Sequence, residues 1–366
     1  MTERARAALP GDGAFMRRAL SVAERGWGQT APNPMVGAVV VRDDVVVGEG
    51  WHTRFGAPHA EVEALRAAGD LARGATMYVT LEPCNHHGHT PPCAEAIIAA
   101  GIARVVAATR DPHDVARGGA ERLRAQDVDV VLGVEEAAAR ELNAPFFHAV
   151  DSDRAFVQLK VALSLDGALT DHTHKRGWLT GPEARREVHR LRAGSDAVAV
   201  GLGTARTDDP TLTVRDFEPL PRVAPARVVF DTSARLPLMS RLVVTAREQS
   251  TVVVCWAPDP AHAAALEHAG VTLVHAATLV DALVALRSAG IRSLLVEGGA
   301  ALAASFLQEA LVDRLIIFRA PIILGADSLN AFAGLPPATV TGAKRWRVVA
   351  SRRFGEDEMT IYAPPI

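Results

Sequence analysis

The sequence predicts an α/β protein built from two domains. Segments typical of buried strands alternate with segments that have the period of amphipathic helices, and this series occurs twice. The polar stretch "VDSDR", residues 150–154, separates the two series. The length of 366 residues also exceeds what one hydrophobic core usually organises. We therefore expect one domain at residues 1–150 and a second at residues 151–366.

The first domain is expected to begin with a hairpin, because "MVGAVVV" and "DVVVGEGW" meet at a turn over residues 42–44. Three buried strands should follow at residues 75–81, 103–109 and 128–133. Helices are expected between and before them, at residues 59–69, 93–101 and 118–126. Repeated alternation of strand and helix implies a largely parallel sheet covered on both faces.

The second domain opens with the apolar segment at residues 155–163 and a predicted helix at 181–194. Further strands are expected, with helices between them, at residues 196–200, 226–230, 251–256, 271–275, 292–297, 313–320 and 359–364. About 215 residues are enough for an independent core. This half therefore predicts a second α/β unit.

Composition narrows the classes of function. Hydrophobic residues make up 49% of the chain and charged residues 22%, as in ordinary globular proteins. The formal net charge of −3 gives no electrostatic reason to expect a nucleic-acid partner. No signal peptide is visible, and no run approaches the ~20 apolar residues of a membrane span. We expect no membrane association and a soluble, cytoplasmic protein.

Three cysteines are too few for a disulfide framework, and two of them lie in one polar loop. That loop follows a motif with metal-ligating potential. His59, Cys84 and Cys93 supply one imidazole and two thiols, which are the ligands that zinc prefers. Three protein ligands are typical of a catalytic zinc site that keeps its fourth position for water. Pro58 and Pro92 predict that two of the ligands stand at helix N-termini, where the positive end of the dipole favours a thiolate.

Glu61 follows His59 by two residues and so cannot point the same way along a helix. It is the candidate catalytic residue, placed to carry protons between a metal-bound water and leaving ammonia. Histidine–x–glutamate with a later proline–cysteine pair is the signature of zinc nucleobase deaminases. Two other interpretations stay open. A structural zinc could take a fourth ligand from His86, His87 or His89, or the two cysteines could be ordinary core residues.

Four stretches in order carry a narrower resemblance: "PNPMVGAVVV", "GEGWHTRFGAPHAEVEAL", "YVTLEPCNHHGHTPPC" and "DPH". With them, residues 12–148 closely resemble the deaminase domain of the bifunctional riboflavin-biosynthesis deaminase/reductase. The eight residues between Cys84 and Cys93, where the usual signature has two, make the match more specific. The resemblance implies a cytidine-deaminase-like three-layer domain that acts on a pyrimidine ribosyl phosphate.

The same resemblance implies that Asn33 and His52 line the substrate pocket, with "HGHT" above it. Asn33 could instead be a turn residue between two prolines, and His52 a surface histidine at a strand end. Many relatives carry Lys or Arg where His89 stands. A contact that needs a fixed cation there would be lost unless His89 is protonated or acts as a neutral donor.

The second half contains no Walker loop and no complete dinucleotide fingerprint. In "LLVEGGAALAASF", however, a buried strand runs into Gly298–Gly299 and then a helix. Such a turn presents bare backbone N–H groups to a phosphate. The glycine pair could equally serve only the close packing of helix on sheet.

The order of "QLKVALSLDG", "WLTGPEAR", "HRLRAGSDAV", "GTARTDDPTLTVR" and "VEGGAALAASFL" resembles the reductase domain of the same bifunctional family. This resemblance implies a dihydrofolate-reductase-like α/β fold, NADPH as cofactor, and assembly into a homo-oligomer, a dimer or tetramer, through the reductase half. It implies that the cofactor contacts Ala162, Trp178, Thr204, Asp208, Gly299, Ala300, Ala301, Leu302, Ala303, Ala304 and Ser305. It likewise implies that the substrate contacts Arg176, Arg192, Leu212, Arg215 and Glu297.

Other interpretations of single residues stay open. Arg192 could lie on a solvated helix face, Arg215 in a surface loop, and Trp178 in the core. Arg176 stands where relatives commonly have a serine, so only a backbone contact would survive there. Lys160 and Asp166 could steer a proton to the substrate. Cys255, in "TVVVCW", is expected to be a buried strand residue without a role.

The sequence thus predicts a two-step enzyme of riboflavin biosynthesis that uses zinc and NADPH. It would deaminate a diaminopyrimidine ribosyl phosphate with a zinc-activated water and then reduce the ribosyl group to ribityl. One rival is a nucleoside or nucleic-acid deaminase fused to an unrelated module, which the aromatic content of 5% disfavours. Another is a regulatory protein that senses zinc or flavin precursors, which would have no need of Glu61.

Overall fold

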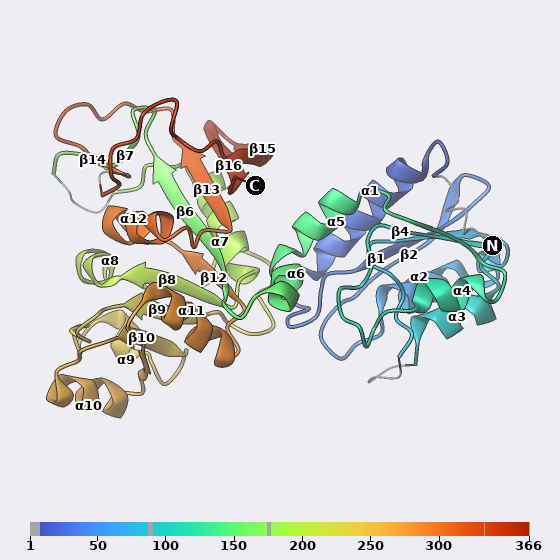
Figure 1. Ribbon diagram of the computed structural model, residues 1–366, viewed down its shortest axis with the longest axis horizontal. Helices are drawn as coiled ribbons and strands as arrows, with labels where there is room; N and C mark the ends of the chain where they lie inside the picture. The colour runs from blue at the N-terminus through green and yellow to red at the C-terminus, as the bar shows by residue number, and fades with distance from the viewer. Residues whose placement is uncertain (1–7, 87–90, 174–176, 333, 366) are drawn as a thin grey trace. The chain divides into compact units, whose positions relative to one another are not determined.

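The structure is a computed structural model that describes residues 8–86, 91–173, 177–332 and 334–365. The chain divides into two compact units, Met1–Asp151 and Ser152–Ile366, each with its own sheet and core (Figure 1). Within the described ranges, we find no helix with the length and apolar character that crossing a bilayer requires.

The first unit is built on a five-stranded sheet. Its strand order is β2-β1-β3-β4-β5, with bounds Val45–Trp51, Gly37–Arg42, Thr76–Val79, Arg104–Ala107 and Asp129–Leu132. The last three strands run parallel, whereas β1 is antiparallel to both of its neighbours. The hairpin turns at Asp43 and Asp44, which both have positive φ, as a tight two-residue turn requires.

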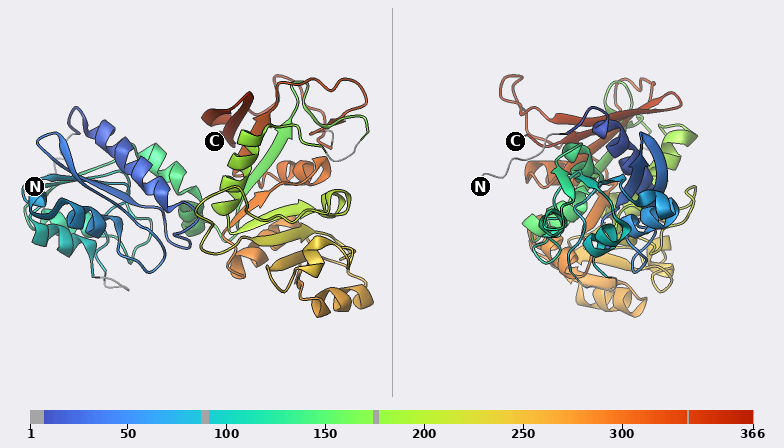
Figure 2. Two further views of the ribbon diagram at one scale, coloured as in Figure 1. Left: turned by 180° about the vertical axis from the view of Figure 1, so that it is seen from behind. Right: turned by 90° about the vertical axis from the view of Figure 1, so that its right-hand side faces the viewer.

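Alternating side chains of β1 explain how both faces of this sheet are covered. Ala38 and Val40 pack against one group of helices, and Val39 and Val41 against another. The first group is α2 (Ala60–Ala68), α3 (Cys93–Ala100) and α4 (Gly119–Arg124). The second group is α1 (Asp12–Ala23) and α5 (Glu136–Leu142). Figures 1 and 2 show the two groups on opposite sides of the sheet, which is the expected three-layer arrangement.

The second unit is built on a nine-stranded sheet, with seven parallel strands followed by an antiparallel pair. The strand order is β11-β10-β9-β8-β12-β6-β13-β16-β15. Their bounds are Thr272–His275, Thr251–Cys255, Ala226–Phe230, Ala197–Gly201, Ser293–Val296, Phe156–Leu163, Arg314–Arg319, Asp357–Ala363 and Arg347–Phe354. A separate two-stranded sheet joins β7 (Ala168–Thr170) and β14 (Leu329–Asn330).

Helices cover both faces of this sheet as well. One face packs against α11 (Leu279–Ser288) and α12 (Ala300–Gln308). The other face packs against two further groups of side chains, which come from α7 (Pro182–Ala193) and from α8 (Leu202–Asp208), α9 (Arg241–Val244) and α10 (Pro260–His268). Cys255 is buried in β10, as the sequence predicts.

Several elements were not predicted from the sequence, among them α1, α5, α6 (Ala144–Asp151), β15 and the short strands β7 and β14. Strand β15 has no residue in the buried class, and Arg352 and Arg353 are exposed on it. It lacks an apolar run because it is the edge strand of its sheet, so the usual pattern for a strand is absent.

Candidate active sites

His59, Cys84 and Cys93 come together in the first unit. Their ligand atoms all lie within 4.8 Å of one another, and this is the cluster that the described residues offer for a metal ion. The His59 Nδ1 is 3.2 Å from the Cys93 Sγ and 3.6 Å from the Cys84 Sγ. The three residues lie far apart along the chain, so the fold assembles the cluster.

Helix termini fix two of the three side chains. His59 is the N-cap residue of α2 and Cys93 is the first residue of α3. Each follows a proline, and the fixed φ of proline favours the entry into a helix. Cys84 lies in the loop after β3, where its Sγ accepts a hydrogen bond from the Cys93 N–H at 3.4 Å. This backbone N–H at a helix start favours a thiolate at Cys84.

The donor set fits zinc. One imidazole nitrogen and two sulfurs within reach of a single ion are a catalytic ligand set, with room for one more ligand. Hydrogen bonding to Cys93 and to His59 lowers the pKa of Cys84 to about 4. The pKa of Cys93 is raised, because it shares the site with the Cys84 sulfur and is buried. Cys84 is therefore the first of the two thiols to ionise.

Glu61 is buried in the first turn of α2, with 3% of its surface exposed. Burial raises its pKa to about 7, although the nearby His59 opposes the shift. A carboxyl group in this setting can exchange a proton near neutral pH. The structure thus places an acid–base group next to the cluster.

Asn33 and His52 lie at the same site. The Asn33 Nδ2 is 3.2 Å from the His52 Nε2, and the His52 Nδ1 is 3.2 Å from the Pro58 carbonyl oxygen. The rings of His52 and His59 meet edge to face at 5.6 Å between centroids. His52 is buried, so the interpretation as a surface histidine is wrong. Burial lowers the pKa of His52, which favours the neutral ring.

A second group of predicted residues gathers at one edge of the large sheet. Strands β8 and β12 are parallel neighbours; α8 begins directly after β8, and α12 begins after a short turn that follows β12. Their first turns therefore meet at the carboxyl edge of the sheet, where ligands of open α/β sheets usually bind. The Gly299 N–H donates to the Thr204 Oγ1 at 3.2 Å and ties the two helix starts together.

The glycine pair before α12 has a packing role at one position. A Cβ atom at Gly298 would lie 2.7 Å from the Leu302 side chain, whereas at Gly299 the nearest atom, the Thr204 Oγ1, would be 3.4 Å away. Close packing therefore accounts for Gly298. Gly299 is the N-cap residue of α12, and Ala300–Ser305 lie within the helix itself.

Arg192 and Glu297 form an ion pair in the interior of the second unit. Two guanidinium nitrogens contact the two Glu297 oxygens at 2.6 and 2.9 Å, and a third donates to the Thr213 carbonyl at 2.9 Å. Burial opposes both charges, yet the pairing raises the pKa of Arg192 and lowers that of Glu297. Arg192 does not lie on a solvated helix face, so that interpretation is wrong.

His189 belongs to this group, and the sequence analysis missed it. It lies three residues before Arg192 on α7, hence on the same helix face. The Arg215 N–H donates to the His189 Nδ1 at 3.2 Å, so a neutral ring carries its proton on Nε2. Burial, with Arg192 and Arg215 nearby, lowers the pKa of His189, and Asp216 and Glu297 only partly offset this. The spacing of "HRLR" on a predicted helix could have indicated it.

Leu212 and Arg215 lie in a segment that is hydrogen-bonded to α7. Arg192 donates to the Thr213 carbonyl, and the Arg215 N–H donates to His189. Leu212 is buried and has a φ of +52°, which is costly for a leucine and requires strong support from its surroundings. The Arg215 side chain is exposed. The segment thus carries an exposed guanidinium, and its backbone is bonded to α7 through His189 and Arg192.

Lys160 and Asp166 differ in their surroundings. Burial lowers the pKa of Lys160, which Glu297 partly opposes and Arg192 reinforces. Asp166 accepts hydrogen bonds from the Ser164 hydroxyl at 2.5 Å and from the Gly325 N–H at 2.8 Å, and these bonds lower its pKa to about 2. Asp166 therefore anchors the loop after β13.

The other predicted residues are widely distributed. Trp178 is 67% exposed, so the interpretation as a core aromatic is wrong, and the Arg185 guanidinium lies 5.3 Å from its ring centroid. Ala162 lies near the end of β6, and Asp208 is the last residue of α8. Arg176 and the "HGHT" stretch, residues 87–90, lie outside the described residues.

Comparison with known families agrees with this division. Residues 11–109 match the cytidine and deoxycytidylate deaminase zinc-binding region. Residues 155–360 match the RibD C-terminal domain. The second unit is therefore not an unrelated module, and the rival function that required one is wrong.

Full-length relatives cover both units. The chain is 44% identical over 314 residues to the riboflavin biosynthesis protein RibD of Aquifex aeolicus, covering 85% of this chain and 87% of that protein. It is 43% identical to RibD of Escherichia coli strain K12, covering 86% and 89%. The crystal form 1 of Acinetobacter baumannii RibD superimposes with a TM-score of 0.84 at 37% identity, covering 97% of this chain and 99% of that one.

A solved structure from Thermotoga maritima is also similar, with a TM-score of 0.83 at 36% identity and coverage of 96% and 98%. It is described as a diaminohydroxyphosphoribosylaminopyrimidine deaminase/5-amino-6-(5-phosphoribosylamino)uracil reductase. These likenesses extend over nearly the whole chain, so they concern both units.

Proposed function

Since this chain belongs to the RibD family of bifunctional deaminase/reductases of riboflavin biosynthesis, we propose which of its residues carry out each of the two reactions. Zinc serves the deaminase and NADPH the reductase. We assign deamination to residues 1–150 and reduction to residues 151–366. The matches of the two units to two different families support this assignment.

The observation that carries the deaminase assignment is the cluster of His59, Cys84 and Cys93, with their ligand atoms within 4.8 Å of one another. These three side chains would hold zinc, which when bound supplies an activated water for attack on the pyrimidine. Glu61 would take a proton from the attacking water on its carboxylate and deliver it to the departing amine. Asn33 and His52, hydrogen-bonded to each other beside His59, would orient the pyrimidine ring.

At the reductase site, NADPH supplies a hydride for C1′ of the opened ribose. The carboxyl edge of β8 and β12 would bind this cofactor, because Thr204 and Gly299 join the two helix starts there. We assign to the same cofactor surface Ala162, Trp178, Asp208 and the helical run Ala300–Ser305. Asp208 is the last residue of α8, and Trp178 is exposed on the surface, so a cofactor could reach both.

The ribosyl phosphate would bind between α7 and the segment around residue 215. Arg192 is held by Glu297 with its guanidinium fixed, and Arg215 projects from a segment bonded to His189. Glu297 and Thr213 accept three of the five Arg192 N–H groups, so two remain for a phosphate oxygen, and the Arg215 guanidinium is exposed. Leu212 and the backbone of Arg176 complete the substrate surface in this proposal.

The order of steps follows from the substrate chemistry. Deamination of 2,5-diamino-6-ribosylamino-pyrimidinone 5′-phosphate gives the uracil, and reduction then turns its ribosyl group into ribityl. We further propose that the chain works in the cytoplasm and forms a homo-oligomer through the second unit.

The deciding experiment supplies the diaminopyrimidine ribosyl phosphate with and without NADPH. Ammonia release and NADPH oxidation are followed separately. We expect ammonia release in both cases and NADPH oxidation only after deamination has produced the uracil. Reduction that runs at full rate when zinc has been removed and no uracil is supplied would contradict the order of steps.

A further inference from the structure

Glu82 is a buried carboxylate that neither reaction uses. It lies in the loop after β3, two residues before Cys84, and only 2% of its surface is exposed. A charged group in the interior is costly unless hydrogen bonds replace its hydration. The groups that donate hydrogen bonds to Glu82 therefore indicate its role.

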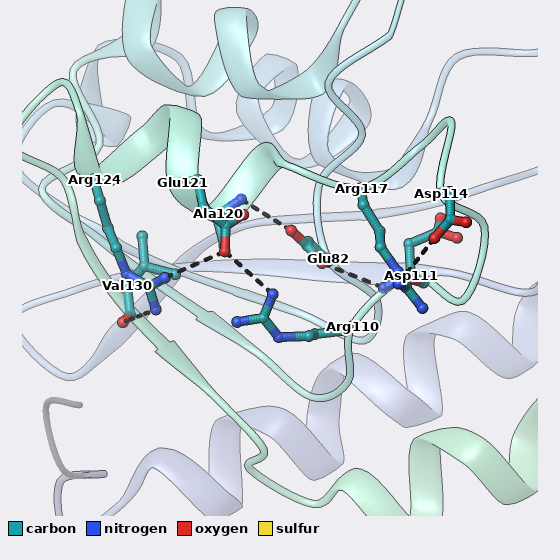
Figure 3. Close-up of polar contacts among 9 residues, drawn as sticks. All are labelled: Glu82, Arg110, Asp111, Asp114, Arg117, Ala120, Glu121, Arg124 and Val130. Carbon is teal, nitrogen blue, oxygen red and sulfur yellow. Dashed lines mark hydrogen bonds and ion pairs between the residues drawn. The ribbon is translucent and has the colours of Figure 1, made fainter. Parts of the chain in front are cut away.

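Two backbone N–H groups satisfy this carboxylate, and they come from different segments (Figure 3). The Ala120 N–H in the first turn of α4 donates to the Glu82 Oε1 at 3.1 Å. The Asp111 N–H, in the loop after β4, donates to the Oε2 at 3.4 Å. Glu82 thus joins the loop that carries Cys84 to a second loop and to a helix.

The residues after Glu82 lie against the same two segments. A Cβ atom at Gly119 would overlap the Pro83 carbonyl oxygen, so α4 approaches the loop as closely as a backbone can. The Asn85 N–H donates to the Ala116 carbonyl at 3.3 Å. One side of the loop is therefore held by residues 111–120.

The other side of the loop faces α3. The Ala94 N–H donates to the Cys84 carbonyl at 3.2 Å, and the Cys93 N–H to the Cys84 Sγ at 3.4 Å. Cys84 therefore stands between α3 and the segments that Glu82 joins. The distance from the Cys84 sulfur to His59 therefore depends on the contacts of the loop with α3 and with residues 111–120.

We propose that Glu82 is a positioning residue of the zinc site, which fixes the Cys84 loop so that the sulfur stays within reach of His59 and Cys93. This inference rests on the proposed function of the cluster as a zinc site. A carboxylate suits the position because both of its oxygens accept. A glutamine would turn an NH₂ group towards one of the two N–H donors, and that donor would lose its partner.

The test is Glu82→Gln in the full chain, with zinc affinity measured by competition against a chromophoric chelator. Loss of a group that orients a metal ligand typically weakens metal binding about 10- to 100-fold, and we expect that range. With Co²⁺ in place of zinc, the thiolate-to-metal and d–d absorption bands should also shift. These readouts report the site itself, independently of deaminase activity.

The matched control is Glu121→Gln on α4. Glu121 forms an exposed ion pair with Arg110 at 3.1 Å, so the same chemical change leaves the Cys84 loop untouched (Figure 3). Zinc affinity and the Co²⁺ spectrum of this variant should equal those of the wild type. NADPH oxidation with the uracil supplied checks that the second unit of each variant is intact.

Wild-type zinc affinity together with a wild-type Co²⁺ spectrum in Glu82→Gln would overturn the proposal, even if the melting temperature falls. Should that variant not fold, Glu82→Asp takes its place, because it keeps the two acceptors and shortens their reach. The same loss of affinity then supports the proposal, and unchanged affinity overturns it. If the wild type itself binds no zinc, the proposed function of the cluster fails instead.

Discussion

Glu61 and His59 show how adjacent side chains take different tasks. His59 is the N-cap of α2 with extended backbone, and Glu61 lies within the first turn. The His59 imidazole therefore contacts the two cysteine sulfurs, whereas the Glu61 carboxyl group is buried and is not a member of the ligand cluster. This separation is what a zinc-dependent deamination needs, because the proton carrier must be free to change its protonation state.

We expect Glu61→Gln to lower the deamination rate by about 10²- to 10⁴-fold, the usual contribution of general acid–base catalysis. Zinc should stay near one equivalent per chain, which elemental analysis of the purified variant measures. His59→Gln is the comparison, and it should lose metal as well as activity. Loss of zinc in Glu61→Gln would mean that ligand and proton carrier have been exchanged in our assignment.

At the proposed reductase site, substitution of His189 tests whether its hydrogen bond positions Arg215, the proposed substrate-binding arginine. His189→Leu removes the acceptor of the Arg215 N–H. We expect the KM for the uracil substrate to rise about tenfold, equivalent to about 1.4 kcal/mol, with kcat much less affected. His189→Asn should restore most of the affinity, since its side-chain oxygen can occupy the place of Nδ1. Equal KM values for the Leu and Asn variants would rule out this role.

Among the elements, helix α1 depends on a buried ion pair at its start. The carboxylate of Asp12 accepts two hydrogen bonds from Arg104 in β4, at 2.8 and 2.9 Å, and one from the Tyr78 hydroxyl in β3 at 2.9 Å. These contacts fix the N-terminus of α1 to the centre of the sheet. Burial alone would raise the pKa of Asp12, but the hydrogen bonds from Arg104, Leu9 and Tyr78 outweigh it, and the pKa is lowered.

The pKa of Asp12 is lower in the folded state than in the unfolded state, where it is about 3.9. Ionised Asp12 therefore stabilises the first unit at pH values above about 3.9, and this contribution is lost as the pH falls through the folded-state pKa. We expect Asp12→Asn to lower the opening free energy of β3 and β4 by about 3 kcal/mol at neutral pH. The difference from the wild type should shrink steadily below about pH 4. Hydrogen exchange followed by mass spectrometry measures it. A difference that is independent of pH would contradict the ion-pair interpretation.

On the scale of the whole molecule, each unit has its own sheet and its own candidate site. All cluster residues of the first site lie before residue 94, and all the charged residues of the second lie after residue 159. Because each site is built from one unit, the two activities should be separable by substitutions.

Arg192→Ala should reduce the NADPH-dependent step by at least about 100-fold, because it removes the proposed phosphate ligand and leaves Glu297 buried without this partner. Ammonia release should be unchanged. Arg186→Ala is the control, since Arg186 is exposed on the same helix. Melting curves of both variants separate loss of binding from loss of fold. Equal loss of both activities in Arg192→Ala would contradict separate sites.

Local sequence was sufficient for features that depend on neighbours in the chain. Runs of apolar residues predicted the central strands, because buried strands need apolar side chains. Helical periodicity and a proline just before the first turn predicted the helices at residues 59–69 and 93–101. The edge strand β15 has no such apolar run, since its residues are mostly exposed. Helix α1 begins after Gly11, which supplies no side-chain cap, so the start of this helix lacks the usual capping signal.

Residue type and spacing were enough to predict the two-unit α/β order, the candidate zinc residues and the family. Which distant residues meet depends on the three-dimensional fold. It joined Glu82 to Ala120, Arg192 to Glu297 and Arg215 to His189. Such contacts arise where strand order brings separate loops to the same sheet edge, and no local pattern in the chain specifies that meeting.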